Sequence, residues 1–130
     1  MAKWHGISRR KSSGGRLKRP SRYRGKRRTE IASEKQHSLI GDPNRKVYRK
    51  RSGLQTVRIL ADETINVNDP STGETKRATL ERVVENPADA NYVRRNIMTK
   101  GAVVQTDLGS VRITSRPGSA GVLNGVLLDE

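Results

Sequence analysis

Apolar and polar residues alternate along the second half of the chain in the way that half-buried β-strands require. The segments 57–59 and 65–67 each place one polar residue between two β-branched residues, and 45–51 alternates well enough to begin a strand. A turn-forming sequence at 69–73 predicts that 65–67 pairs with 76–80 as a β-hairpin.

The rest of this region repeats the pattern of strand and turn. A second hairpin is predicted from 102–106 and 111–114, which are joined across 107–110, and an apolar run at 122–128 predicts a last strand. The sequence shows no internal repeat and no alternation of strands with long helices. The pattern therefore favours an all-β body over a layered α/β fold.

Signals for helices are few. Asn86-Pro87 resembles a helix cap followed by proline at the first helical position, which predicts one short helix over 87–92. The segment 80–84 fits either a helical turn or a strand, and 24–34 is compatible with a short helical turn. The sequence at 41–44 predicts a turn.

Short strands at close spacing predict a small closed or partly closed β-barrel. The core of such a barrel is expected to be thin and aliphatic, since the chain has no Phe, one Trp and three Tyr. We therefore predict a mainly β protein, in which a long basic and mostly irregular N-terminal extension, residues 1–44, precedes a β-barrel body, residues 45–130.

Charge divides the chain more sharply than hydropathy does. The formal net charge is +14, and residues 1–51 carry eighteen Lys or Arg against three Asp or Glu, whereas residues 52–130 carry nine against ten. Residues 1–28 hold twelve Lys or Arg and no acidic residue. Such a block repels itself and needs a polyanion to become ordered, so nucleic acid is the predicted partner.

Two other roles for the basic block remain open. It could be a solvated tail that serves solubility or localisation, as charged runs often are. An anionic membrane surface fits less well, because 9–28 lacks the apolar stripe that interfacial helices carry. Gly14-Gly15 and Pro20 interrupt any helix there, which predicts an extended arm whose glycines permit close approach of the backbone to phosphates.

Catalytic and metal-binding residues are scarce. The absence of Cys removes disulfides, thiol catalysis and the usual structural zinc sites, and it fits a reducing cytoplasm. His5 and His37 lack metal-site spacing, and the sequence contains no phosphate-binding P-loop, no serine triad and no evident carboxylate pair. Neither a signal-peptide core nor a membrane-spanning stretch is present. We expect a soluble cytoplasmic protein that is not an enzyme and uses no cofactor, metal or small-molecule substrate.

Arginine is the commoner cation, at eighteen of the 27 basic residues. Its planar guanidinium binds phosphate through two hydrogen bonds and stacks on bases, which favours close contact with RNA over simple solvation. Trp4, Tyr23 and Tyr48 lie in the cationic region, where they could stack on unpaired bases. For Tyr48, packing against the barrel is an equally good interpretation.

The candidate RNA-binding residues are the cations, paired glycines and some aromatic residues of the basic region, with four cations of the body. In the basic region, residues 1–51, which includes the start of the body, they are Lys3, Trp4, His5, Arg9, Arg10, Lys11, Gly14, Gly15, Arg16, Lys18, Arg19, Arg22, Tyr23, Arg24, Lys26, Arg27, Arg28, Arg45, Lys46, Arg49, Lys50 and Arg51. In the body they are Arg94, Arg95, Lys100 and Arg116.

Motifs typical of one protein family occur along nearly the whole chain. They are Trp4-His5-Gly6-Ile7-Ser8, Ser13-Gly14-Gly15-Arg16-Leu17, Ile40-Gly41, Arg49-Lys50-Arg51-Ser52-Gly53, Val57-Arg58-Ile59-Leu60 and, most specifically, the segments 92–104 and 114–124. The sequence resembles the small-subunit ribosomal protein numbered eight in the eukaryotic and archaeal series, and not the bacterial-type protein of that number. Its ending and short length indicate the archaeal branch. Two segments, 30–32 and 52–55, depart from the family's pattern.

The resemblance implies a β-barrel body with a basic extension threaded into ribosomal RNA. It predicts a structural constituent of the ribosome that binds small-subunit ribosomal RNA through the Arg-rich arm, stabilises the RNA fold and contacts neighbouring small-subunit proteins. The alternative is a DNA-compacting or chromatin-type protein, which the arm alone would permit. The net charge of −1 on residues 52–130 argues against a body that wraps DNA.

Overall fold

The structure is a computed structural model that describes residues 3–4, 8–18, 30–32 and 34–128. It divides into two units, Met1–Lys35 and Gln36–Glu130. In the first unit, strand β1 (Lys3–Trp4) pairs antiparallel with β2 (Ile31–Ala32). Within the segment 24–34, where the sequence was compatible with a short helical turn, Glu30 has a 3₁₀ conformation, whereas Ile31 and Ala32 form β2, since pairing with a distant strand outweighs a weak local helical signal. Residues 24–29 and 33 lie outside the described residues.

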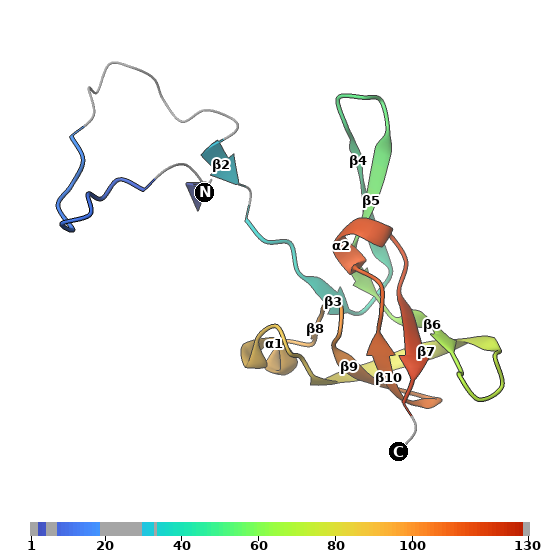
Figure 1. The fold of residues 1–130 in the computed structure, drawn as a ribbon. Helices are drawn as coiled ribbons and strands as arrows, with labels where there is room; N and C mark the ends of the chain where they lie inside the picture. Colours follow the sequence, from blue (N-terminus) through green and yellow to red (C-terminus); the bar gives the residue numbers. More distant parts are fainter. Residues whose placement is uncertain (1–2, 5–7, 19–29, 33, 129–130) are drawn as a thin grey trace. The chain divides into compact units, whose positions relative to one another are not determined.

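The second unit is built almost entirely of strands (Figure 1). They are β3 (Ser38–Ile40), β4 (Asn44–Arg49), β5 (Gln55–Asp62), β6 (Thr64–Asn68), β7 (Thr75–Glu85), β8 (Ile97–Met98), β9 (Val103–Thr106), β10 (Gly109–Ile113) and β11 (Asn124–Leu127), with helices α1 (Ala90–Arg94) and α2 (Pro117–Ala120). Five strands close into a barrel in the order β10-β11-β6-β7-β9, and a four-stranded sheet has the order β4-β5-β3-β8. The predicted mainly β fold with a small barrel is confirmed.

Both predicted hairpins of the barrel are present. The β6–β7 turn is held by Asp69, whose carboxylate accepts hydrogen bonds from the backbone and hydroxyl of Ser71 and from the hydroxyl of Thr72. These bonds, chiefly those from Ser71, hold the pKa of Asp69 below its ordinary value. The β9–β10 turn is tighter than predicted, since only residues 107–108 separate the strands.

The ambiguous segment 80–84 is a strand, because β7 continues to Glu85. Its pairing with β9 shifts register between Leu80 and Arg82 and again between Val83 and Glu85. A β-bulge inserts an extra residue and changes which side chains face the core. Leu80 and Val83 are consequently both buried, at 5% and 4% exposure, although they are three residues apart. The bulges therefore account for the apparent helical spacing.

The predicted helix over 87–92 begins later than expected. Helix α1 starts at residue 90 and is capped by Asp89, not by Asn86. Asn86 is buried instead: its side chain donates to the carbonyl oxygen of Ile97 and accepts a hydrogen bond from the hydroxyl of Thr99. The Asn86 amide thus joins the end of β7 to β8, and its oxygen also accepts a hydrogen bond from the Ala88 backbone amide at 3.0 Å, which closes a turn ahead of the helix.

The core of the second unit is aliphatic and small, as predicted. Its buried members are Ile59, Ile65, Val67, Ala78, Leu80, Val83, Met98, Ala102, Val104, Val111, Ile113 and Leu123. Strands pack so closely around this core that a Cβ added to Gly125 on β11 would overlap Val111 on the neighbouring strand β10. Glycine at this position allows the barrel to close.

Candidate nucleic-acid interface

The β4–β5 hairpin is the most cationic element of the second unit, and Figure 1 shows it projecting beyond the barrel. Its turn is closed by hydrogen bonds between Lys50 and Leu54, at 2.8 Å, and from the Gly53 amide to the Lys50 carbonyl, at 3.0 Å. No acidic residue lies between Asp42 and Asp62. The exposed cations of the hairpin are Arg45, Lys46, Arg49, Lys50, Arg51 and Arg58.

Tyr48 lies inside a polar cluster on one face of this hairpin. The Arg58 guanidinium lies 4.9 Å and the Lys46 ammonium 5.4 Å from the centre of its ring, as in cation–π contacts. The amide nitrogen of Gln36 donates to the Tyr48 hydroxyl at 2.7 Å. Tyr48 therefore contacts two cations of its own hairpin and the Gln36 side chain.

An ion pair between an exposed arginine and a buried aspartate fixes the base of the hairpin. Arg45 Nη2 lies 2.8 Å from Asp62 Oδ2, and Asp62 is only 1% exposed. The other carboxylate oxygen accepts hydrogen bonds from the backbone of Glu63 and from the backbone and hydroxyl of Thr64. Burial raises the pKa of Asp62, but the hydrogen bonds from Arg45 and Thr64 outweigh burial and hold that pKa below its ordinary value. Arg45, a predicted RNA-binding residue, thus has a partner within the fold.

In the first unit, residues 8–18 fold back on themselves where an extended arm was predicted. The Lys11 amide donates to the Gly15 carbonyl at 2.8 Å, and Arg10 bridges to Arg16 as in an antiparallel pair. Gly14 has a φ of +81°, a left-handed conformation that glycine adopts without steric cost. The turn leaves its five cations exposed, namely Arg9, Arg10, Lys11, Arg16 and Lys18.

The remaining predicted site residues are distributed as follows. Lys3 and Trp4 are described only as members of strand β1. Eight others lie outside the described residues: His5, Arg19, Arg22, Tyr23, Arg24, Lys26, Arg27 and Arg28. Arg94 is in the last turn of α1 and Arg95 is its C-cap.

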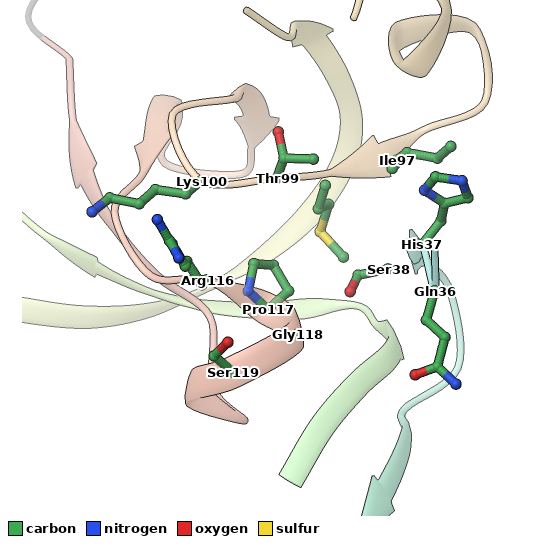
Figure 2. Close-up of a pocket in the computed structure, with 11 residues that line it drawn as sticks. Gln36, His37, Ser38, Ile97, Thr99, Lys100, Arg116, Pro117, Gly118 and Ser119 are labelled. Atoms are coloured by element: carbon green, nitrogen blue, oxygen red, sulfur yellow. The ribbon is translucent and has the colours of Figure 1, made fainter. Parts of the chain in front are cut away.

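Lys100 and Arg116, by contrast, come together at one pocket of about 380 Å³. Its walls are formed by the segments 36–38, 97–100 and 116–119, from the start of β3, from β8 with the turn that follows it, and from α2 (Figure 2). This pocket was not predicted from the sequence.

Arg58, a cation of the β4–β5 hairpin, was also not predicted as a site residue. Arg58 pairs with Lys46 across the strands, so the alternation of β4 and β5 was the signal that could have identified it.

Two further observations concern the part of the chain that the structure describes. It contains no group of three or more His, Asp or Glu side chains arranged to hold a metal ion. Its helices, of five and four residues, have neither the length nor the hydropathy that a membrane-spanning helix needs.

Comparison with known proteins identifies the family. The model of the family described as Ribosomal protein S8e matches residues 4–128. The small ribosomal subunit protein eS8 of Methanospirillum hungatei is 50% identical over 126 residues, which cover 97% of this chain and 98% of that protein. The proteins of the same name from Methanoculleus marisnigri and Methanosarcina barkeri are 47% and 41% identical, over 96% and 98% of this chain and over 98% and 99% of their own lengths. The resemblance seen in the motifs is confirmed, and the chain belongs to the ribosomal protein S8e family.

Proposed function

We propose that this chain is a structural constituent of the small ribosomal subunit that binds small-subunit ribosomal RNA and stabilises its fold. Membership of the family carries the coarser statement, a structural role in the ribosome. The finer statement is that RNA is bound through the basic extension, residues 1–44, and through the β4–β5 hairpin. The observation that carries it is the separation of charge, with twelve cations and no acid in residues 1–28.

Electrostatics explains why such an extension binds RNA. Each phosphate that a Lys or Arg neutralises releases condensed counterions, so affinity rises with the number of contacts and falls as salt increases. Arginine adds bidentate hydrogen bonds to phosphate and stacks on bases. The exposed cations of residues 8–18 surround a turn whose backbone is itself exposed, so phosphates can approach them closely.

The β4–β5 hairpin offers cations on both of its faces. Lys46 and Arg58 are paired across the strands and share one face. Arg49 lies an odd number of residues from Lys46 along β4, so its side chain points to the opposite face. A ribbon that is cationic on two sides fits between two RNA backbone segments better than it fits against one flat surface.

Contacts at its base and with the end of α2 support this hairpin. The ion pair between Arg45 and Asp62 anchors the base of β4 to the end of β5. Gly121, the C-cap of α2, packs closely against Val57 of β5. A Cβ added to Gly121 would lie 2.9 Å from Val57 Cβ. The body of residues 45–130 thus presents one preformed cationic element. We expect neighbouring small-subunit proteins to contact the body, and we expect the chain to act in the cytoplasm as part of the ribosome.

Competition binding distinguishes RNA from DNA as the target. The full chain is titrated with labelled small-subunit ribosomal RNA, and unlabelled ribosomal RNA or duplex DNA of equal nucleotide content is added at one salt concentration. We expect ribosomal RNA to compete at a concentration at least about tenfold lower than DNA, a difference of about 1.4 kcal/mol. Equal competition would instead favour a DNA-compacting protein. Co-sedimentation of the chain with intact small subunits is the complementary test.

A further inference from the structure

The pocket between β3, β8 and α2 combines an apolar floor with a cationic end. Ile97 and Met98 are 0% and 2% exposed, and Pro117 is also buried. Lys100 and Arg116 are exposed and both line the pocket, and Figure 2 shows both side chains toward the same end of it. No acidic residue lines the pocket. This combination suits a ligand that is anionic at one end and flat and weakly polar at the other.

The two cations of the pocket are not engaged by the protein. Neither Lys100 nor Arg116 makes an ion pair or a side-chain hydrogen bond with any residue that the structure describes. By contrast, two hydroxyls of the wall are already used: Ser38 donates to the carbonyl of Ile59 and Thr99 donates to Asn86. Both cations of the pocket therefore remain available to a ligand.

The opposite end of the pocket carries Gln36 and His37 (Figure 2). The His37 ring packs edge-on against Tyr92 at 5.2 Å, which fixes its orientation, and its nitrogens make no hydrogen bond within the described residues. Gln36 also belongs to the Tyr48 cluster of the β4–β5 hairpin. The pocket is thus continuous with the cationic hairpin through one residue.

We propose that this pocket binds a single unpaired nucleotide of the RNA, with its base between the walls formed by 97–99 and 117–119 and its phosphate held by Lys100 and Arg116. A volume of about 380 Å³ lies at the small end of the range for ligand pockets, about 300–1,000 Å³, and it suits one nucleotide better than a helix. RNA recognition depends largely on unstacked bases of loops and bulges, whose faces stack and whose edges form hydrogen bonds. This inference rests on the proposed function, and it names the RNA feature that the body recognises.

A substitution that fills the pocket without changing its charge tests whether the pocket binds a nucleotide. Gly118 lines it, has no positive φ, and an added Cβ there would meet nothing within 4 Å, so Gly118→Leu fills space without forcing strain. Ala120→Leu is the matched control, because it adds a larger side chain to the same helix at an exposed position that does not line the pocket. Arg116→Met removes one cation of the pocket, and Arg112→Met, on β10, is its matched control.

Binding of each full-length variant is measured to a transcript of small-subunit ribosomal RNA and to a perfect RNA duplex. We expect Gly118→Leu and Arg116→Met to lower the preference for the transcript over the duplex by about tenfold, while the two controls keep the wild-type ratio. An unchanged ratio in Gly118→Leu, with a wild-type melting temperature, would overturn the inference and leave the proposed function intact. If the wild-type chain itself shows no preference for the transcript over the duplex, both this inference and the proposed function are contradicted.

Competitors separate recognition of a nucleotide from recognition of phosphate alone. Adenosine and uridine monophosphate are compared with inorganic phosphate as inhibitors of transcript binding, at constant ionic strength. We expect the nucleotides to inhibit wild-type binding at lower concentration than phosphate, and this difference to vanish in Gly118→Leu. Equal inhibition by nucleotides and phosphate would contradict a base in the pocket.

Discussion

The ion pair between Arg45 and the buried Asp62, at the base of the β4–β5 hairpin, provides a quantitative test of how the hairpin is held. In Asp62→Asn the amide oxygen can still accept hydrogen bonds from the backbone of Glu63 and from Thr64, as the wild-type Oδ1 does. The amide nitrogen, however, replaces the oxygen that accepts from Arg45. A guanidinium only donates, so the substitution removes the ion pair and sets two donors against each other.

The expected loss of stability follows from these contacts. A hydrogen bond to a charged group contributes about 1.5–3 kcal/mol, and leaving a buried donor without a partner costs about 1–3 kcal/mol. The Arg45 side chain is 47% exposed and regains water when released, which offsets part of the loss. We expect Asp62→Asn to lower the free energy of unfolding by about 2 kcal/mol at neutral pH. Asp62→Ala, which also loses the bonds to Glu63 and Thr64, should lose about 3–4 kcal/mol.

The loss should also depend on pH in a defined direction. The folded pKa of Asp62 lies below its unfolded value, which is about 3.9. The carboxylate therefore stabilises the fold fully above that unfolded value, and its contribution disappears as the pH falls through the folded pKa. The difference between wild type and Asp62→Asn should be constant near pH 7 and should shrink below about pH 4.

Urea unfolding followed by circular dichroism at pH 7, 5 and 3 measures both effects. Glu63→Gln is the control, since Glu63 is the exposed acidic neighbour, and we expect it to change stability by less than about 0.5 kcal/mol. Wild-type stability of Asp62→Asn at pH 7 would refute the reasoning. So would a deficit that remains undiminished at pH 3.

Three further predictions concern the core, the extension and the hairpin. Gly125→Ala places a methyl group on Val111 and should lower the free energy of unfolding by about 1–3 kcal/mol in urea denaturation; no loss would contradict the tight closure of the barrel. Arg→Lys substitution at eight positions of the extension preserves charge, and we expect it to lower the preference for cognate over unrelated RNA by about tenfold in titrations. The same preference in variant and wild type would mean that the extension acts only as a generic polycation. These positions are Arg9, Arg10, Arg16, Arg19, Arg22, Arg24, Arg27 and Arg28. Replacing Arg49, Lys50 and Arg51 by Gln should reduce the salt-dependence slope of RNA binding by about 2 without changing the urea midpoint, and an unaltered slope would exclude the hairpin from phosphate contact.

The strands of the barrel were predictable because their apolar residues alternate with the period of a pleated sheet. Prediction was less successful where distant contacts decide the outcome. The bulges that place Leu80 and Val83 in the core depend on the register with β9, which the sequence of β7 does not encode locally. Asn86 accepts the local hydrogen bond from the Ala88 amide that its sequence suggests, but it does not cap α1, and its bond to Ile97 across eleven residues could not be predicted locally.

The candidate interface was predictable in its charge and not in its geometry. Clustering of Lys and Arg along the chain identifies a surface for a polyanion without any structure. The partnership of Arg45 with Asp62 and the meeting of Lys100 with Arg116 both require the topology of the sheets. The pocket combines three segments separated by about sixty and about twenty residues, so no local motif could have indicated it.

The central claim is that residues 1–28 provide most of the electrostatic contact with small-subunit ribosomal RNA. The direct measurement is the dependence of RNA affinity on salt for three proteins: the full chain, a chain lacking residues 1–28, and the Arg94→Gln, Arg95→Gln double variant. Each neutralised phosphate adds roughly 0.7–0.9 to the slope of log affinity against log salt. If half of the twelve cations contact phosphate, the deletion should lower the slope by about 4–5, and the double variant by less than about 2. Equal slopes for the deletion and the double variant would place the electrostatic contact on the body and contradict the account.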